Sequence, residues 1–303
     1  MILKYSVTEP DKGEKVLTIL KQRMHCSGTL VKRLKSNNTI FLNGQPTYSN
    51  VPVNTGDIVS IAILEHRINH NVPAQNIPIE VLFEDEFMII INKEAGIAIH
   101  PAGNYIHSTL ANALRYYFFE QGIDMTIRPV GRLDRNTSGI VIFAKNSHVM
   151  SRMIESLKQS DAAKIYIGLV HGTPAEDSGL IDLPIKRAED SIISRVTASD
   201  GKPSQTLYKV IEKYKDASLI EYKLLTGRTH QIRLHSSSIG CPLIGDGIYG
   251  DDSKTAHIIN RHALHCSTVA FIHPFTGELT SIKAPLPDDI QKAISHFGTT
   301  VDG

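Results

Sequence analysis

Short strand-like runs dominate the sequence from Ile79 onward, and they constrain the fold more than any other feature. Apolar and β-branched residues form runs at 79–83, 87–92, 139–144, 164–170, 205–211, 218–224, 265–272 and 279–283. Helical patterns are plausible at 108–120, 147–158 and 287–296. Because neighbouring strands follow one another through short turns, the pattern favours a mixed, largely antiparallel sheet over a doubly wound parallel one. We therefore predict an α+β domain over residues 79–300, with helices flanking the sheet.

A smaller unit is indicated before that domain. Apolar residues recur at helical spacing in two short stretches on either side of Ser27-Gly28: Val16, Ile19 and Leu20, then Leu30, Val31 and Leu34. A β-branched run from Thr39 leads into an Asn43-Gly44 turn, a strong hairpin signal, and a last strand covers 58–63. Two short helices and these strands predict a miniature α+β unit over residues 1–65.

The stretch between the two units is polar. From Glu65 to Pro78 it contains two prolines and shows no periodicity. Such a composition is typical of an extended linker. We therefore place a linker at 66–78 and expect the two units to move relative to each other.

The charge of the chain is nearly balanced, with 32 Lys and Arg residues against 31 Asp and Glu, so no overall basic field indicates a nucleic-acid partner. The balance is uneven, however. Residues 1–65 hold eight basic and five acidic residues, which gives +3 there and −2 in the remainder. Three of the basic residues, Lys32, Arg33 and Lys35, lie on or just after the second predicted helix.

Several classes of protein are disfavoured by what the sequence lacks. Cys26, Cys241 and Cys266 show no pairing pattern and are expected to be buried thiols in a reducing compartment. The sequence starts without a basic and apolar leader, and its longest apolar run, 87–91, is too short to span a membrane. Phosphate-loop, dinucleotide, zinc-protease and nucleophile-elbow motifs are missing, and the glycine-rich segment 245–250 predicts only a tight turn. We expect a cytoplasmic protein without a membrane segment, metal or nucleotide cofactor.

One polar loop could carry chemistry. In residues 128–146 the glycine-bounded stretch with Arg132, Asp134 and Arg135 leads directly into an apolar strand. A carboxylate flanked by cations and attached to a rigid strand suits an ionised nucleophile. The alternative is a turn in which Asp134 accepts backbone hydrogen bonds and pairs with an arginine. This segment alone favours the turn.

A second segment, 224–235, combines a strand end with the start of a predicted helix at Arg228. Arg228, His230, Gln231 and Arg233 could together bind a phosphate or a carboxylate. The alternative is a solvated helix start. Because the helix dipole slightly disfavours cations there, we expect Arg228 to have an anionic partner, with Asp134 as the candidate.

Together, GRLDRNTSG (131–139) and GRTHQIR (227–233) resemble the RluA/RluD family of pseudouridine synthases. Four further segments match that family in order: INKEAGIAIHP (91–101), KIYIGLVHG (164–172), PLIGDGIYG (242–250) and RHALHCSTVAFIHPFTGE (261–278). The resemblance covers about residues 79–285, and several ordered motifs are far more specific than one. Gly131 stands where this family usually has histidine, and Glu94 where it commonly has proline.

The resemblance implies an enzyme that breaks the N-glycosidic bond of a uridine in RNA, turns the base and rejoins it through carbon, with no cofactor or metal. It makes Asp134 the catalytic carboxylate and Arg228 its expected partner. Tyr166 resembles the tyrosine that packs on the flipped uracil, and Arg132 the arginine that fills the vacated space. The other polar positions of the two motifs become expected substrate-binding residues, namely Thr137, His230, Gln231 and Arg233.

Residues 1–65 resemble the small S-four-like RNA-binding module that often precedes such domains. Lys32, Arg33 and Lys35 are then the expected RNA contacts, although Ser27 to Leu30 stand where the module is usually basic. We expect a monomer whose partner is RNA, most simply ribosomal RNA of the large subunit. The alternatives are the same chemistry on transfer RNA, a non-catalytic RNA-binding or ribosome-assembly protein, and an unrelated hydrolase that uses Asp134 with His230.

Overall fold

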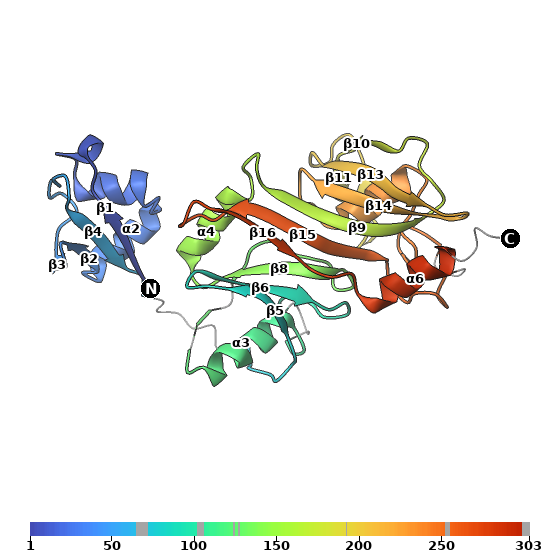
Figure 1. Ribbon diagram of the computed structural model, residues 1–303, viewed down its shortest axis with the longest axis horizontal. Coiled ribbons are helices and arrows are strands. Elements are labelled where there is room, and N and C mark those ends of the chain that lie inside the picture. Colours follow the sequence, from blue (N-terminus) through green and yellow to red (C-terminus); the bar gives the residue numbers. More distant parts are fainter. Residues whose placement is uncertain are drawn as a thin grey trace.

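The computed structural model describes residues 1–64, 72–101, 106–123, 125–126, 128–191, 193–251 and 255–298. Within these ranges two bodies of secondary structure follow one another along the chain (Figure 1). The first is built on a four-stranded sheet. The second is built on a long ten-stranded sheet, to which a two-stranded hairpin is added.

The N-terminal body is a small sheet with short helices, as the apolar spacing predicts. Its strands β1 (Ile2–Ser6), β4 (Ile58–Ala62), β2 (Ile40–Leu42) and β3 (Gln45–Pro46) pair antiparallel in that order. Its helical segments are η1 (Glu9–Asp11), α1 (Val16–Thr18), η2 (Ile19–Arg23) and α2 (Gly28–Ser36). Ser27 caps α2, because its side chain accepts a hydrogen bond from the Leu30 N–H. The apolar side of α2 is buried in the core of this body.

The strands of the second body are β5 (Glu80–Glu84), β6 (Met88–Lys93), β7 (Arg128–Pro129), β8 (Ser138–Ala144), β9 (Ala163–His171), β10 (Ser178–Asp182), β13 (Gln205–Lys213), β14 (Ala217–Leu224), β15 (Leu264–Ile272) and β16 (Leu279–Lys283). They run in the order β10-β13-β14-β9-β15-β8-β6-β5, with β16 on β15 and β7 on β8. Among the described strands only β8 and β15 pair in parallel. The predicted mixed, largely antiparallel sheet is therefore confirmed. β11 (Ile185–Arg187) and β12 (Arg195–Thr197) form the separate hairpin.

Helices cover both faces of this sheet. They are α3 (Leu110–Glu120), α4 (Ser147–Ser156), α5 (Gln231–Ser238) and α6 (Asp288–Gly298). Successive residues of β8 point to opposite faces: Ile140 and Ile142 pack in the core with α4 and α5, whereas Val141 and Phe143 pack with α3. The strand that carries the Arg-Leu-Asp loop is thus buried on both faces, which gives that loop a rigid base.

Part of the predicted linker is attached to the second body. Residues 65–71 lie outside the described residues. Val72 is buried against α3, and the Pro73 carbonyl accepts a hydrogen bond from Asn112 Nδ2 at 2.7 Å. Gln75 N–H donates to the Asn112 carbonyl at 3.1 Å. The expectation of an extended tether is therefore wrong for residues 72–75, because one buried asparagine of α3 holds them.

The two bodies also touch through a small apolar contact. Met1, Phe87 and Phe275 pack against the cores of both. Asn146 Nδ2 lies 2.9 Å from Met1 Sδ across the same contact. None of the helices in the described ranges is both long and apolar enough to cross a membrane.

Candidate active site

Asp134 lies in the short loop that leads into β8. The Thr137 N–H donates to the Asp134 carbonyl at 3.1 Å, which closes a turn. The loop continues into Gly139, where φ is 108° and a Cβ would lie 2.2 Å from the Cys266 carbonyl oxygen. Only glycine allows β8 to approach β15 so closely. That contact fixes the end of the loop and therefore the place of Asp134.

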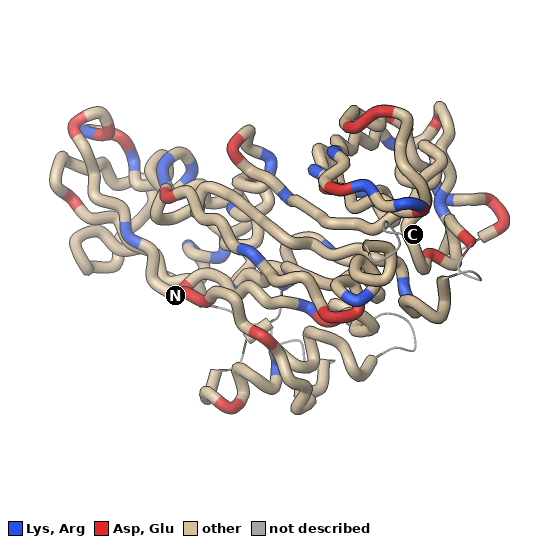
Figure 2. The backbone as a smooth tube through the Cα atoms, turned by 45° about the vertical axis from the view of Figure 1, so that its right-hand side comes forward, with Lys and Arg blue, Asp and Glu red and all other residues tan. Residues whose placement is uncertain are grey.

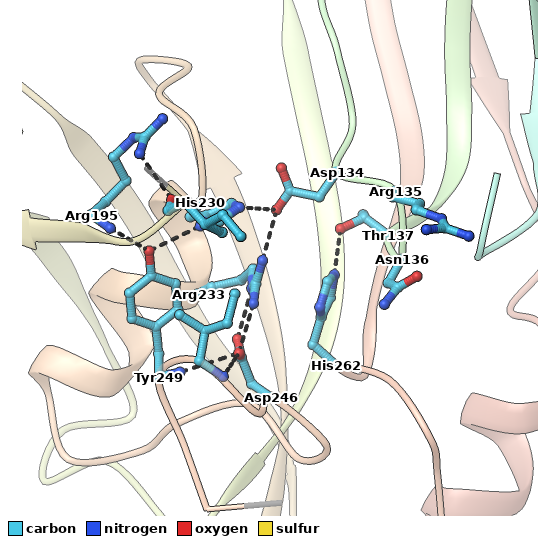
Figure 3. A network of polar contacts seen from close by, with 12 residues as sticks. Asp134, Arg135, Asn136, Thr137, Arg195, His230, Arg233, Asp246, Tyr249 and His262 are labelled. Atoms are coloured by element: carbon cyan, nitrogen blue, oxygen red, sulfur yellow. Dashed lines mark hydrogen bonds and ion pairs between the residues drawn. The ribbon is translucent and has the colours of Figure 1, made fainter. Parts of the chain in front are cut away.

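Two basic side chains reach the Asp134 carboxylate from the start of α5 (Figure 3). Arg233 Nη1 lies 3.4 Å from Asp134 Oδ2, and His230 Nε2 lies 3.8 Å from the same oxygen. The Asp134 side chain is 25% exposed, whereas that of Arg233 is only 6% exposed. The Asp134 carboxylate thus contacts the buried Arg233 on one side and remains partly accessible to solvent.

Arg233 is oriented by a second carboxylate. Asp246 is fully buried and accepts hydrogen bonds from Arg233 Nε at 2.8 Å and Nη2 at 2.7 Å. Burial by itself would raise the pKa of Asp246, but the hydrogen bonds and the charge of Arg233 outweigh it and lower that pKa. Asp246 stays ionised, and Arg233 stays charged and fixed in direction. Asp246 belongs to the segment interpreted from sequence as a tight turn only, so its role was missed.

His230 stands at the N-terminal end of α5 in a left-handed conformation, with φ 60°. Its Nδ1 is 2.9 Å from the Tyr249 hydroxyl, which accepts a hydrogen bond from the Arg195 N–H at 2.9 Å. The Tyr249 hydroxyl can then donate its proton to His230 Nδ1, which acts as the acceptor. We therefore assign the ring proton to Nε2, which faces Asp134. Burial lowers the pKa of His230, and a neutral ring presents an N–H to the carboxylate at pH 7.

The expected pair of Arg228 with Asp134 is not formed. Arg228 is exposed, and its Nε donates to the Pro203 carbonyl at 3.2 Å. The helix begins at Gln231 rather than at Arg228, so Arg228 lies in the preceding turn while Arg233 lies in the first helical turn. Arg233 therefore takes the place that the sequence analysis gave to Arg228.

Gln231 and Thr137 are buried rather than available to a substrate, each 2% exposed. The Gln231 amide makes four hydrogen bonds: it accepts from the Arg228 N–H and the Thr226 hydroxyl, and it donates to the Gln205 carbonyl and Thr206 Oγ1. The Thr137 hydroxyl lies 2.8 Å from His262 Nε2. We therefore assign both residues to the support of the loop and helix instead of to substrate contact.

Tyr166 lies on β9 and is only 6% exposed. A hollow between the loop and β8, β9 and β15 is lined in part by Gly131, Arg132, Lys164, Tyr166 and Cys266. Burial raises the pKa of Tyr166 well above its usual value, and Cys266 and the charge of Asp134 add to this effect. The phenol is therefore protonated at neutral pH and within electrostatic range of Asp134. Arg132 is exposed at the edge of the hollow.

The glycine at position 131 has a local explanation. Its φ is 88°, and a Cβ there would lie 3.2 Å from Lys164 Nζ. A side chain at this position would be strained and would press on the Lys164 ammonium, whose pKa burial lowers. Glycine thus leaves room for the partly buried Lys164 in the wall of the hollow.

Lys93 stabilises the Asp134 loop through a hydrogen bond to its backbone. Its side chain is 1% exposed, and Nζ donates to the carbonyls of Glu94, Ile97 and Arg135 at 2.8, 2.9 and 2.9 Å. Burial and the nearby charge of Arg261 lower its pKa to about 7. The Asn-Lys motif was quoted from sequence for its resemblance alone, and its contact with residue 135 was not foreseen.

The expected RNA-binding residues lie on α2 in the N-terminal body. Lys32 and Lys35 are exposed, and Arg33 is partly buried. Basic and acidic positions are interspersed along the backbone of both bodies (Figure 2). No group of three or more metal-ligating side chains gathers among the described residues.

Known proteins match this chain over most of its length. A family model described as RNA pseudouridylate synthase matches residues 87–238. The chain is 34% identical over 296 residues to the uncharacterized RNA pseudouridine synthase YlyB of Bacillus subtilis, covering 96% of this chain and 97% of that one. It is 38% identical over 247 residues to ribosomal large subunit pseudouridine synthase D of Zymomonas mobilis, covering 78% and 77%.

A solved structure shares the fold. Human RNA Pseudouridylate Synthase Domain Containing 1 aligns with 76% of this chain and 99% of its own, at a TM-score of 0.58 and 24% identity. The matched family region contains the Asp134 loop and the start of α5, which meet in the site described above. The chain therefore belongs to the RNA pseudouridylate synthase family, and it is an RNA pseudouridine synthase of the RluA/RluD type.

Proposed function

We propose that this RNA pseudouridine synthase uses Asp134 as its catalytic carboxylate and acts, without a cofactor, on uridines of large-subunit ribosomal RNA. The observation that carries the proposal is the setting of Asp134. It is a solvent-accessible carboxylate, paired with the buried Arg233 and faced by His230. It follows residues 130–133, which line a small hollow together with Tyr166.

The net reaction exchanges one bond to the sugar for another. The bond between N1 of uracil and C1′ of ribose breaks, a bond between C5 and C1′ forms, and one proton leaves C5 while one joins N1. The product is an isomer of the substrate, so no oxidant, reductant or co-substrate is consumed. A positioned carboxylate and a pocket that holds the turning base supply what such a reaction needs.

The two oxygens of Asp134 have different surroundings. Both basic partners, Arg233 and His230, lie close to Oδ2. Oδ1 has no hydrogen-bonding or ionic partner among the described residues. We infer that Oδ1 faces the substrate, while Oδ2 is held by the protein. An aspartate held in this way can present Oδ1 to the sugar or base of a bound uridine.

The uridine must leave its stack to reach this position, which costs a few kcal/mol. Tyr166 forms part of the wall of the hollow, and a base stacked on an aromatic ring gains roughly 1–3 kcal/mol. Arg132 is exposed at the edge of the same hollow, where its guanidinium can occupy the space that the base leaves. Together these two residues offset the cost of flipping the base.

The N-terminal body supplies a second contact with RNA in this proposal. Lys32 and Lys35 are exposed on α2, and Arg33 lies beside them. Phosphate contacts of this kind add affinity without reading sequence. Arg228 is an exposed cation beside the site and is assigned to the RNA backbone as well.

The choice of RNA rests on relatives. Proteins named ribosomal large subunit pseudouridine synthase D, from Zymomonas mobilis and Nitrosomonas europaea, are each 38% identical to this chain over 247 and 223 residues. Pseudouridine mapping of ribosomal and transfer RNA tests it, in cells with the gene, without it, and with Asp134→Asn. We expect specific large-subunit sites to disappear in the last two. Loss in transfer RNA alone would contradict the proposed substrate, and full modification with Asp134→Asn would contradict the catalytic assignment.

A further inference from the structure

Two buried basic side chains donate hydrogen bonds to consecutive carbonyls directly after Asp134. Lys93 Nζ donates to the Arg135 carbonyl at 2.9 Å, and Arg261 Nη1 donates to the Asn136 carbonyl at 3.0 Å. Both side chains are almost fully enclosed, with exposures of 1% for Lys93 and 5% for Arg261. The loop that carries Asp134 is thus held by basic side chains from two distant parts of the chain.

Arg261 does more than bind one carbonyl. Its Nη2 lies 3.3 Å from Ser138 Oγ, and its Nη1 also donates to the carbonyls of His262 and Leu264 at 3.3 Å. The guanidinium therefore joins the loop before β8 to the segment before β15. Thr137 and His262 make a second link between the same two segments, at 2.8 Å.

The charge of Arg261 is balanced from α6. Asp289 accepts hydrogen bonds from Arg261 Nε at 2.6 Å and from Nη2 at 2.9 Å, a two-pronged ion pair. Burial would raise the pKa of Asp289, but the hydrogen bonds and charge of Arg261 lower it. A buried guanidinium without this carboxylate would be a charge without a counter-ion, and it would be drawn towards solvent.

We propose that Arg261, held by Asp289 of α6, is a positioning residue for Asp134. By fixing the Asn136 carbonyl two residues after the aspartate, it sets the direction in which the Asp134 carboxylate stands relative to Arg233 and His230. α6 thereby controls the rate of the reaction although Asp289 itself does not touch the site residues. The inference rests on the proposed catalytic role of Asp134.

A purely structural role for the pair makes a different prediction. If Arg261 and Asp289 only attached α6 to the domain, their loss would lower stability and leave the rate of the folded enzyme unchanged. If they position Asp134, the rate falls in protein that is folded and binds RNA normally. Small misplacements of a reacting group cost up to about 100-fold in rate.

The experiment compares Asp289→Asn with Asp288→Asn in the full-length enzyme. Asp288 is the neighbouring exposed residue in the same first turn of α6, so it controls for the loss of a negative charge there. Single-turnover pseudouridine formation and RNA affinity are measured well below each melting temperature. We expect Asp289→Asn to lower the rate about tenfold or more with RNA affinity within about twofold, and Asp288→Asn to keep the wild-type rate.

Two further variants complete the test. Asp289→Glu retains the carboxylate and should recover most of the rate. Arg261→Lys retains the buried charge but loses the planar fork, so it should be slow even where Asp289→Asn does not fold. A wild-type rate in Asp289→Asn or Arg261→Lys, or an equal loss in Asp288→Asn, would overturn the proposal.

A readout that does not need activity separates this proposal from the assignment of Asp134. Hydrogen exchange of the 134–138 amides should be faster in Asp289→Asn than in Asp288→Asn. If Asp134→Asn is active, the catalytic assignment fails while faster exchange still shows that Asp289 holds the loop. Unchanged exchange in Asp289→Asn means that Asp289 does not hold it, whatever Asp134 does.

Discussion

Asp246 grips Arg233 through two hydrogen bonds of 2.7 and 2.8 Å, and the remaining nitrogen of the same guanidinium faces Asp134 at 3.4 Å. One cation is therefore shared by two carboxylates with different tasks. The buried Asp246 fixes the direction of the Arg233 guanidinium. The accessible Asp134 forms an ion pair with the same guanidinium. A lysine in the same place could not satisfy both, because it lacks the planar fork.

Replacing Asp246 by Asn should affect both stability and rate. Breaking a buried ion pair from one side costs about 3–5 kcal/mol, because the partner is left as an unpaired buried charge. We expect a lower free energy of unfolding in denaturant, and a lower single-turnover rate because Arg233 is no longer aimed at Asp134. A variant with the stability and rate of the parent would show that Asp246 does not orient Arg233.

Asp134→Asn should abolish pseudouridine formation and leave RNA binding intact. The amide keeps the shape of the side chain but is neither a nucleophile nor a base of comparable strength. Single-turnover assays at saturating enzyme, together with filter binding of the same RNA, separate the two effects. Turnover at the wild-type rate would remove Asp134 from the mechanism.

Lys93→Met should change how stability depends on pH. The pKa of Lys93 is about 7 in the folded protein, below the usual 10.5, so between these values the unfolded chain holds more protons. The burial of the charged Lys93 therefore destabilises the folded protein in full below pH 7. This destabilisation disappears as the pH rises towards 10.5. We expect the free energy of unfolding of the wild type, relative to Lys93→Met, to rise by up to about 1.4 kcal/mol per pH unit in that window. Equal slopes from pH 7 to 10 would contradict this.

Gly131→Ala should damage the hollow as well as the backbone. Gly122 offers a matched control, since it also has a positive φ, 71°, but a Cβ there meets nothing within 4 Å. Both alanine variants should lose about 1–2 kcal/mol of stability from backbone strain. Only Gly131→Ala should also lose activity, because its methyl group displaces Lys164 beside Tyr166. Equal activity in the two variants would show that the space around Lys164 is unimportant.

Lys32→Ala combined with Lys35→Ala should weaken RNA binding and flatten its dependence on salt. Each lost phosphate contact on single-stranded RNA reduces the slope of log affinity against log salt by about 0.7. Lys12→Ala is a suitable control within the same body, because Lys12 is already paired with Glu9 at 3.6 Å. An unchanged slope in the double variant would exclude α2 as a phosphate-binding surface.

The strands at the centre of the fold were predictable because burial leaves a direct trace in the sequence. β6 and β8 are buried on both faces and read as continuous apolar runs. β10, β11 and β12 are short and partly exposed, with mixed polar and apolar residues. No sequence pattern therefore predicted them.

The sequence indicated which residues belong to the candidate site better than it indicated which of them contact each other. The motifs identified Asp134, Tyr166, His230 and Arg233, but the spacing of residues could not tell which arginine faces the aspartate. That depends on where α5 begins, and the left-handed His230 that starts it has no clear sequence signal. Lys93, Asp246 and Arg261 act across long separations in the chain, which local patterns do not encode.

The parallel pairing of β8 with β15 joins Ser138 to His265 and Gly139 to Cys266. Residues up to 250 include both motifs, 131–139 and 227–233, whereas β15, which anchors the Asp134 loop, follows only at Leu264–Ile272. Contacts between such distant segments form late, because a long loop must close first. A chain that lacks β15 therefore contains Asp134 and Arg233 but lacks the strand that fixes the end of the Asp134 loop.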